Sequence, residues 1–400
     1  MTAKSNLGST TIQAEATYMG AGSGAVRVIE TQEVVDTTSL VRESLPDTST
    51  RASIWNGGTA PTLGLRSGEP DVIVDLAGMG ANAGGIIADD SSGAVISLAV
   101  GVSSGGTGTT AIAGWTTTTG ATAIGGAAGL AKAEMILVET TTGNWVAAIA
   151  DIVTDTLTVV PALPTAPAAA AKLYAGVTYT PTETRLTCIL KIHKDSEPVG
   201  YEARGVHFTP EFSNLGAGEG KARLTLKSTI GDWDHITSAL ATADPPDTFV
   251  GPGVIQDHGR FVLTDGTATV TCIASTFTVS ALLTAMRRQD ACAENVVGAP
   301  EILPSADRQI ETELWQSAGA STGPLAQLRI WFAAGTMLSC LYQIGNTPGD
   351  VLAFYFPGVY LKDEPKEMDK NGLMAIKTTL KISIDANSTV FTKPFYFARF

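Results

Sequence analysis

Two glycine-rich stretches are the parts of this sequence that could bind a nucleotide. DVIVDLAGMGANAGG at residues 71–85 places glycines behind an expected strand, as a dinucleotide-binding turn does. That site needs a helix directly after the glycines to receive the pyrophosphate, but GGIIADDSSGAV follows instead. LGAGEGKAR at residues 215–223 is one residue short of the phosphate-loop spacing, and Ala222 replaces the Ser or Thr that binds magnesium. Neither stretch predicts a nucleotide site.

The side chains that most often act in catalysis or bind metals are scattered along the chain. The four histidines form no HExxH motif and the four cysteines no CxxC motif, so neither zinc nor a redox pair is indicated. A metal site built from distant residues stays an open alternative. No GxSxG motif supports a serine hydrolase, and acid pairs such as Asp89-Asp90 lie in turn-like sequences. We therefore expect no catalytic residue, no metal and no cofactor, and rank an enzyme last.

The composition favours a large protein that associates with copies of itself. The 400 residues are 44% hydrophobic, enough for a sizeable core and two domains, but only 16% are charged. Sparse charge indicates a surface hidden against copies of the same chain. The net charge of −13 argues against wrapping nucleic acid, yet lets DNA slide past without sticking. The sequence shows no secretory signal and no apolar stretch of membrane-spanning length, which favours the cytosol.

Alternation of apolar and polar residues with period two predicts a mainly β chain. Eight stretches predict strands: 25–35, 71–78, 133–140, 156–163, 185–193, 222–229, 259–266 and 268–275. Helical spacing predicts three helices: 38–45, 231–243 and 278–289. Residues 91–131 carry no charge; alternation from Ile96 to Val100 predicts that this segment opens as a strand and continues as a loop or small insertion.

A pattern of corner, loop and strand occurs twice. Residues 205–229 and 358–382 both begin with Gly-Val and a ring-bearing side chain, pass through a loop of similar length and end in a strand. With a gap of one residue in the loop, Leu226 aligns with Leu380. Any two amphipathic strands look alike, but the shared order favours a duplication. It predicts two similar β-domains, 1–243 and 244–400, with a Gly/Thr-rich insertion around 76–130 in the first.

Two stretches give the chain a resemblance to the tail tube proteins of long-tailed bacteriophages. They are GYEARGVHFTPEFSNLGAGEGKARLTLKSTIGDW at residues 200–233 and PGVYLKDEPKEMDKNGLMAIKTTLKISIDA at residues 357–386. Residues 133–181 add a weaker likeness. The resemblance implies two tandem β-sandwich or split-barrel domains, each with a packed helix. It also implies trimeric rings of pseudo-sixfold symmetry, stacked into a tube.

The function implied by this resemblance is that of a structural virion protein, not an enzyme. Its partners would be further copies of itself and other tail proteins, with no membrane; DNA would pass through the lumen without specific binding. It would belong to the virion tail and assemble in the host cytoplasm. A minor tail, adhesion or receptor-contacting β-protein is the alternative. A charged loop is the candidate ring-stacking contact, with an ordinary solvated loop as the other interpretation; its residues are Lys362, Asp363, Glu364, Lys366, Glu367, Asp369 and Lys370.

Overall fold

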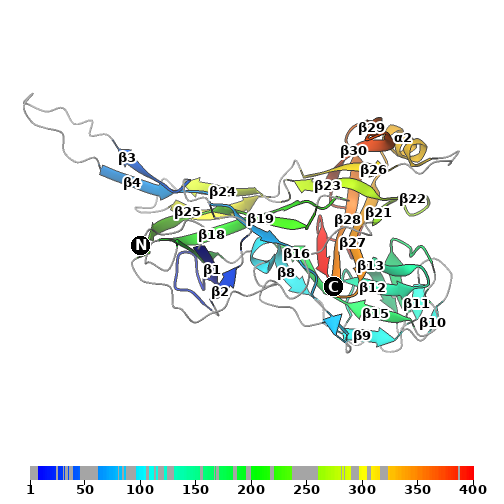
Figure 1. Cartoon of the computed structure of the whole chain (residues 1–400), viewed down its shortest axis with the longest axis horizontal. Helices are drawn as coiled ribbons and strands as arrows, with labels where there is room; N and C mark the ends of the chain where they lie inside the picture. The colour runs from blue at the N-terminus through cyan, green and yellow to red at the C-terminus, as the bar shows by residue number, and fades with distance from the viewer. Residues whose placement is uncertain are drawn as a thin grey trace, which may run out of the picture.

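The computed structural model describes most of the strands of this chain and their pairing (Figure 1). The described residues are 8–23, 26–29, 31, 35, 39–45, 62–79, 81–82, 85–86, 96–104, 108–111, 114–115, 121–123, 130–153, 156–165, 167, 171–182, 187–194, 200–216, 220–236, 260–280, 282, 284–289, 297–303, 308–315, 323–385 and 388–400. Within these residues the protein is mainly β and every strand pair is antiparallel, as the alternation predicts. None of the described helices is long and apolar enough to cross a membrane.

One group of strands lies mostly in the N-terminal half, and we call it the first strand set. Its members are β1 (Gly8–Ala14), β2 (Arg27–Ile29), β5 (Val72–Asp75), β17 (Cys188–Lys194), β18 (Gly200–Ser213), β19 (Arg223–Thr229) and β20 (Asp232–His235). β1 pairs with β2 and β17, and β17 pairs with β18. β18 pairs with β19 and β20, and β19 pairs with β5.

A second strand set in the C-terminal half has the same pairing order. Its members are β21 (Arg260–Thr264), β22 (Thr269–Cys272), β26 (Gln309–Trp315), β27 (Leu338–Thr347), β28 (Asp350–Leu361), β30 (Leu373–Ser383) and β31 (Tyr396–Arg399). β21 pairs with β22 and β27, and β27 pairs with β28. β28 pairs with β30 and β31, and β30 pairs with β26. Both sets belong to one 18-stranded sheet among the described residues.

A β-bulge occurs at the same place in the two sets. In the first set Cys188 pairs with Val206, and the register shifts before Leu190. In the second set Leu338 pairs with Val359, and the register shifts before Cys340. Each bulge therefore lies at the Gly-Val step of the sequence pattern. A bulge adds a residue to one strand and bends it, so its recurrence reflects a shared local geometry.

Two hairpins occupy matching positions between the strands of each set. In the first set, β3 (Val41–Leu45) and β4 (Thr62–Ser67) lie between β2 and β5 in the chain. In the second set, β24 (Thr284–Gln289) and β25 (Val297–Leu303) lie between β22 and β26, after β23 (Ala274–Ser280). Figure 1 shows both hairpins pointing the same way along the long axis of the molecule.

The chain between β5 and β17 contains a separate seven-stranded sheet. Its strands are β9 (Gly108–Ala111), β10 (Gly114–Trp115), β11 (Ala121–Ala123), β12 (Met135–Thr140), β13 (Gly143–Val153), β14 (Thr156–Val160) and β15 (Lys172–Ala175). Ile136, Ile149 and Leu173 belong to a hydrophobic cluster of its own. The Gly/Thr-rich segment around 76–130 thus contributes to a sheet that extends well beyond it.

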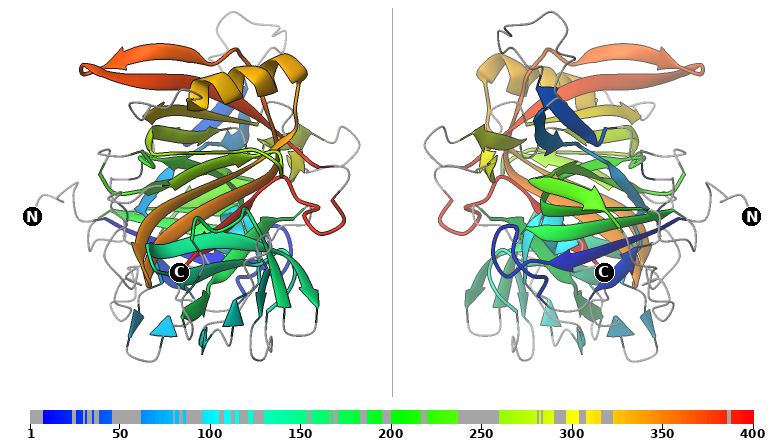
Figure 2. Two further views of the ribbon diagram at one scale, coloured as in Figure 1. Left: turned by 90° about the vertical axis from the view of Figure 1, so that its right-hand side faces the viewer. Right: turned by 90° about the vertical axis from the view of Figure 1, so that its left-hand side faces the viewer.

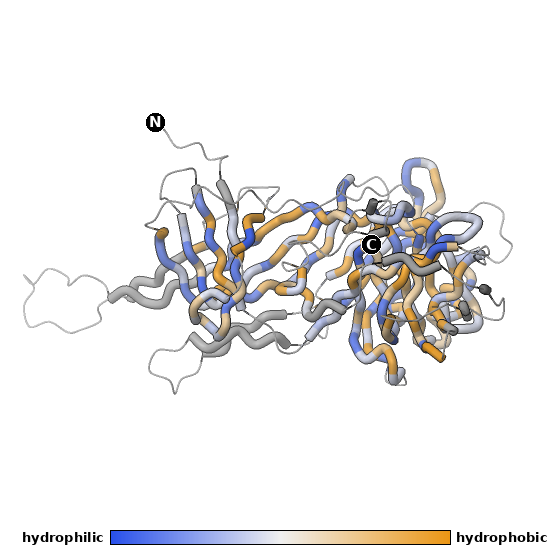
Figure 3. Tube along the Cα trace, turned by 90° about the horizontal axis from the view of Figure 1, so that it is seen from below, coloured by the Kyte–Doolittle hydropathy of each residue, from blue (hydrophilic) through white to orange (hydrophobic). Residues whose placement is uncertain are grey.

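Four further strands lie between β5 and β17 in the chain. β8 (Gly101–Ser104) and β16 (Val177–Pro181) pair with each other, and β16 also pairs with β31. Both strands belong to the 18-stranded sheet. β6 (Ala81–Asn82) and β7 (Gly85–Ile86) pair with each other, and each is two residues long. Figure 3 shows hydrophobic and hydrophilic segments alternating along many of the strands.

All eight predicted strand stretches contain a strand, but the three predicted helices are wrong. Residues 232–235 form β20, 284–289 form β24 and 41–45 form β3; residues 237–243 lie outside the described part. Trp233 packs edge-on against Tyr201 of the neighbouring strand, at 5.6 Å between ring centroids. Pairing with existing strands therefore outweighed weak helical spacing, as is common for short segments.

Helices occur instead where none was predicted. Residues 96–99 form a short helix in place of the expected strand, because Ile96 and Val100 share an i to i+4 hydrogen bond of 2.8 Å. Helix α2 (Pro324–Ala334) has Pro in its first turn and ends at Gly335, whose φ of 61° lies in the left-handed region. It buries Leu325, Leu328 and Trp331, and it contacts β22 and β28. The predicted domain boundary at 243/244 lies outside the described residues.

Candidate assembly surfaces

The predicted ring-stacking loop is a strand-containing segment at one end of the molecule. Residues 362–365 follow β28, and Lys366–Lys370 form β29, which pairs with β30. Figure 2 shows the β29–β30 hairpin projecting beside α2. The structure therefore brings all seven predicted residues together, but as a hairpin edge where the sequence predicts a loop.

Three of the seven side chains are held by contacts within the chain. Lys370 Nζ lies 2.7 Å from Glu313 Oε2 and donates a hydrogen bond to Ser275 Oγ at 3.1 Å. Lys362 Nζ donates to the side chain of β26 residue Gln309 at 3.2 Å. Glu364 lies 3.7 Å from Nε of Arg329 on α2, a contact between exposed groups that adds little stability. These contacts fix the two ends of the segment to β23 and β26, and Glu364 near its start contacts α2.

The remaining charged side chains are available to a partner. Asp363, Lys366 and Glu367 are exposed, and none has an ion pair within the described part of the chain. Asp369 is exposed as well, but its Oδ1 accepts a hydrogen bond from the Gly372 amide at 2.9 Å. Charged residues on an edge strand keep it from pairing with unrelated chains, so a specific partner must match them.

Exposed apolar side chains flank this charged edge. Leu373 and Met374 at the start of β30 are 60% and 49% exposed, and Ile330 on α2 is 60% exposed. Met337, just after α2, is 45% exposed. Apolar side chains beside charged ones are typical of protein–protein contact surfaces, which combine an apolar centre with a polar rim.

The turn between β29 and β30 carries a sequence signal that predicts a hairpin. Asn371 and Gly372 have φ values of 56° and 80°, and the type I′ hairpin turn requires positive φ at both positions. Asn-Gly between two stretches of alternating apolar and polar residues is the strongest short-range hairpin signal. This strand pair could therefore have been predicted from the printed sequence.

Replacing Gly372 with valine should open this hairpin without unfolding the protein. A β-branched residue in the left-handed region costs about 1–2 kcal/mol, and Gly372 has open space around it, so strain is the only penalty. Hydrogen exchange at the β29 amides should accelerate by roughly tenfold. Gly372→Asn is the matched control, because asparagine tolerates this backbone region and should change exchange much less. Equal protection in both variants would contradict the assigned turn.

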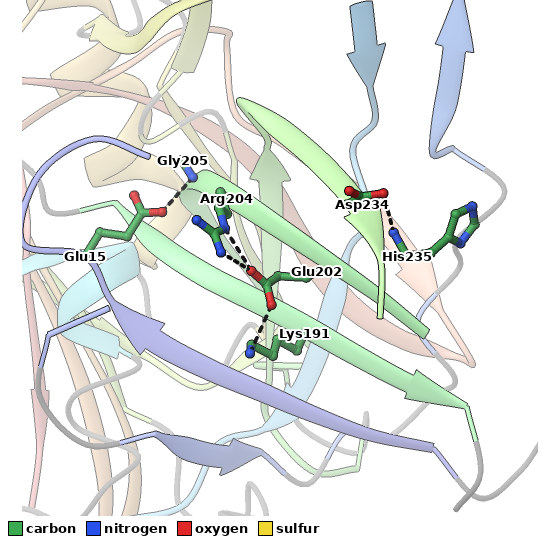
Figure 4. A network of polar contacts seen from close by, with 7 residues as sticks. All are labelled: Glu15, Lys191, Glu202, Arg204, Gly205, Asp234 and His235. Carbon is green, nitrogen blue, oxygen red and sulfur yellow. Dashed lines mark hydrogen bonds and ion pairs between the residues drawn. The ribbon is translucent and has the colours of Figure 1, made fainter. Parts of the chain in front are cut away.

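A polar cleft of about 410 Å³ lies where β18 meets β20, and its lining includes Glu202, Arg204, Trp233 and His235. Figure 4 shows the polar network around it. Glu202 lies 3.0 Å from Lys191 Nζ and 2.7 Å from Arg204 Nη2. Burial raises the pKa of Glu202, but these two cations lower it by more, so the carboxylate stays charged. Its charge is thus already neutralised within the chain.

The histidines and cysteines, which the sequence assigns to no site, are both buried and exposed where the structure describes them. His193 and His207 are buried, His235 is exposed, and His258 lies outside the described residues. Cys188, Cys272 and Cys340 are buried free thiols, and burial raises the pKa of Cys272 to about 11; Cys292 lies outside the described part. No group of three metal-binding side chains occurs among the residues that the structure describes.

Comparison of the sequence with known protein families and with curated proteins finds no match.

Proposed function

We propose that this chain is a structural subunit that assembles with copies of itself into the stacked rings of a phage tail tube. The observation that carries the proposal is the repeated pairing order of the two strand sets, with a bulge at the same Gly-Val step in each. Two similar units in one chain are what a trimeric ring of pseudo-sixfold symmetry requires. In this proposal the units are the domains 1–243 and 244–400, each a sandwich or split barrel.

The helices support the proposal of one packed helix in each unit. The short helix at 96–99 follows β5 and precedes β17, and α2 follows β26 and precedes β27. The two helices therefore occupy matching places in the pairing order. Ile96 and Ala99 of the short helix and Val100 directly after it are completely buried.

The proposed location of the protein follows from its net charge and from its proposed assembly. The net charge of −13 permits a lumen that repels the phosphates of passing DNA, which needs a conduit that does not bind it. We place the protein in the virion tail, assembled in the host cytoplasm with other tail proteins and without catalysis. The charged segment 362–370 is proposed as a contact between copies of the chain.

Electron microscopy of the purified protein tests this function directly. We expect closed rings or hollow tubes of uniform width, growing longer with protein concentration. A chain that stays monomeric at concentrations well above those in a cell would contradict the proposal.

A minor tail or adhesion protein is the second candidate, and the seven-stranded sheet favours it. That sheet has its own hydrophobic cluster and lies to one side of the large sheet (Figure 1), as an exposed binding module would. Compact trimers that never stack, together with binding to host cells, would support this alternative over the tube.

A further inference from the structure

We infer that the β3–β4 hairpin of one chain docks on the segment Lys362–Lys370 of a second copy. The two strand sets already make a contact of this kind within one chain. The proposed contact would repeat it between two chains. The inference rests on the proposed self-association, but it does not require stacking into a tube.

The contact within the chain joins the β23–β25 region of the second set to β18 and β19 of the first. Val279 of β23 pairs with Phe212, near the end of β18. Beyond this point β24 contacts both β18 and β19, and β25 contacts β18. The β24–β25 hairpin therefore lies along the first strand set, as Figure 1 shows.

The β3–β4 hairpin is the counterpart of β24–β25 in the pairing order. Along the chain, β3–β4 lies between β2 and β5, and β24–β25 lies between β22 and β26. The flanking strands correspond, because β2 pairs with β1 as β22 does with β21, and β5 pairs with β19 as β26 does with β30. Each hairpin also has a register shift, between Arg42 and Ser44 in one and between Arg287 and Gln289 in the other. Among the described residues, the β24–β25 hairpin thus contacts the first strand set, whereas the β3–β4 hairpin has no comparable contact with the second set.

The acceptor segment in the second set is identified by aligning the two strand sets on their Gly-Val steps. Phe212 lies seven residues after Gly205, and Pro365 lies seven residues after Gly358, the matching glycine. Pro365 is in the middle of the charged segment, directly before β29. Within the described residues β29 pairs with β30 alone, so its other edge has no strand partner there. Pro365 itself is buried, so a second chain would pair along the exposed residues on either side of it.

The β3–β4 hairpin needs such a partner for a physical reason. An isolated two-stranded hairpin is marginally stable in water, and apart from their mutual pairing the main described contact of these strands is between β4 and β20. Figure 1 shows β3–β4 and β29 at opposite ends of the long axis. A contact between opposite ends is heterologous and joins chains head to tail, so it closes rings when the rotation permits.

Two variants separate the donor hairpin from the acceptor segment. In the donor variant, residues 41–67 are replaced by a short glycine link; Leu40 and Gly68 lie side by side, so the link closes without strain. In the acceptor variant, three exposed charges are reversed: Asp363→Lys, Lys366→Glu and Glu367→Lys. Lys172→Glu, an exposed charge on the seven-stranded sheet, is the matched control. Thermal unfolding of each variant checks that it folds.

Sedimentation of the variants, alone and mixed, gives the decisive result. We expect each variant alone to lose at least tenfold in association and to sediment as a single chain where the parent protein assembles. An equal mixture should form one-to-one dimers, because one intact hairpin and one intact acceptor remain. An acceptor variant that still forms single rings, or a mixture that stays monomeric, overturns the inference and leaves the proposed function standing. A monomeric parent protein contradicts both.

Discussion

Replacing Arg399 with leucine is expected to lower the free energy of unfolding by about 3–5 kcal/mol. Arg399 lies in β31 and is completely buried. Its Nε donates to the carbonyl of Ala77 at 3.0 Å, and its Nη2 donates to the carbonyl of Gly78 at 3.2 Å. Both carbonyls follow β5, so this side chain ties the last strand of the second set to the first set. Leucine would leave buried acceptors without a donor, and each costs about 1–3 kcal/mol.

Urea unfolding monitored by tryptophan fluorescence measures this loss. Arg329→Leu is the control, because Arg329 is half-exposed on α2 and its ion pair with Glu364 spans 3.7 Å. An exposed pair of this kind contributes less than about 1 kcal/mol. A loss below about 1 kcal/mol in Arg399→Leu would contradict the buried role assigned here.

Replacing Gln343 with leucine is expected to destabilise the protein by about 2–4 kcal/mol and to loosen the seven-stranded sheet first. Gln343 on β27 is completely buried. Its Oε1 accepts from the Val146 amide at 2.8 Å, and its Nε2 donates to the Asn144 carbonyl at 2.9 Å. Asn346 adds a second link, with its Oδ1 accepting from the Asn144 amide at 2.6 Å. These bonds join β13 of the seven-stranded sheet to β27 of the large one.

Because leucine has nearly the volume of glutamine, the change isolates the hydrogen bonds from packing. Amide hydrogen exchange along β13 should accelerate more than exchange along β28. β28 is the comparison because the hydrogen bonds of Gln343 do not join it to the seven-stranded sheet. Gln309→Leu on β26 is the control, since its side chain bonds only to Glu311 and Lys362 among the described residues, both at exposed positions away from β13. Uniform acceleration in all strands would argue against a local link.

The sequence predicted strands well where a strand buries one face and exposes the other. In β19, for example, Leu224 and Leu226 are buried and alternate with Thr225 and Lys227, and that alternation is visible in the printed residues. The helix α2 was missed although Pro324 and Gly335 mark its two ends, the positions that proline and glycine favour. Its buried residues recur every third position, which is a weaker signal than a full amphipathic stripe.

The candidate surface was only partly predictable. The charges of 362–370 and the Asn371-Gly372 turn are readable from the sequence, and the turn alone predicts the β29–β30 hairpin. The burial of Arg399 and Gln343 is not readable, because their partners lie more than 190 residues away in the chain. Local patterns do not identify which distant backbone group a polar side chain will meet.

The presence of both strand sets in one polypeptide has a consequence for how assemblies of this chain can grow. The two sets are covalently linked, so they do not separate on dilution, whereas any contact between chains does. Strand sets consequently enter and leave an assembly in pairs. Every assembly of intact chains contains an even number of them, and a closed ring of five or seven sets is excluded by parity.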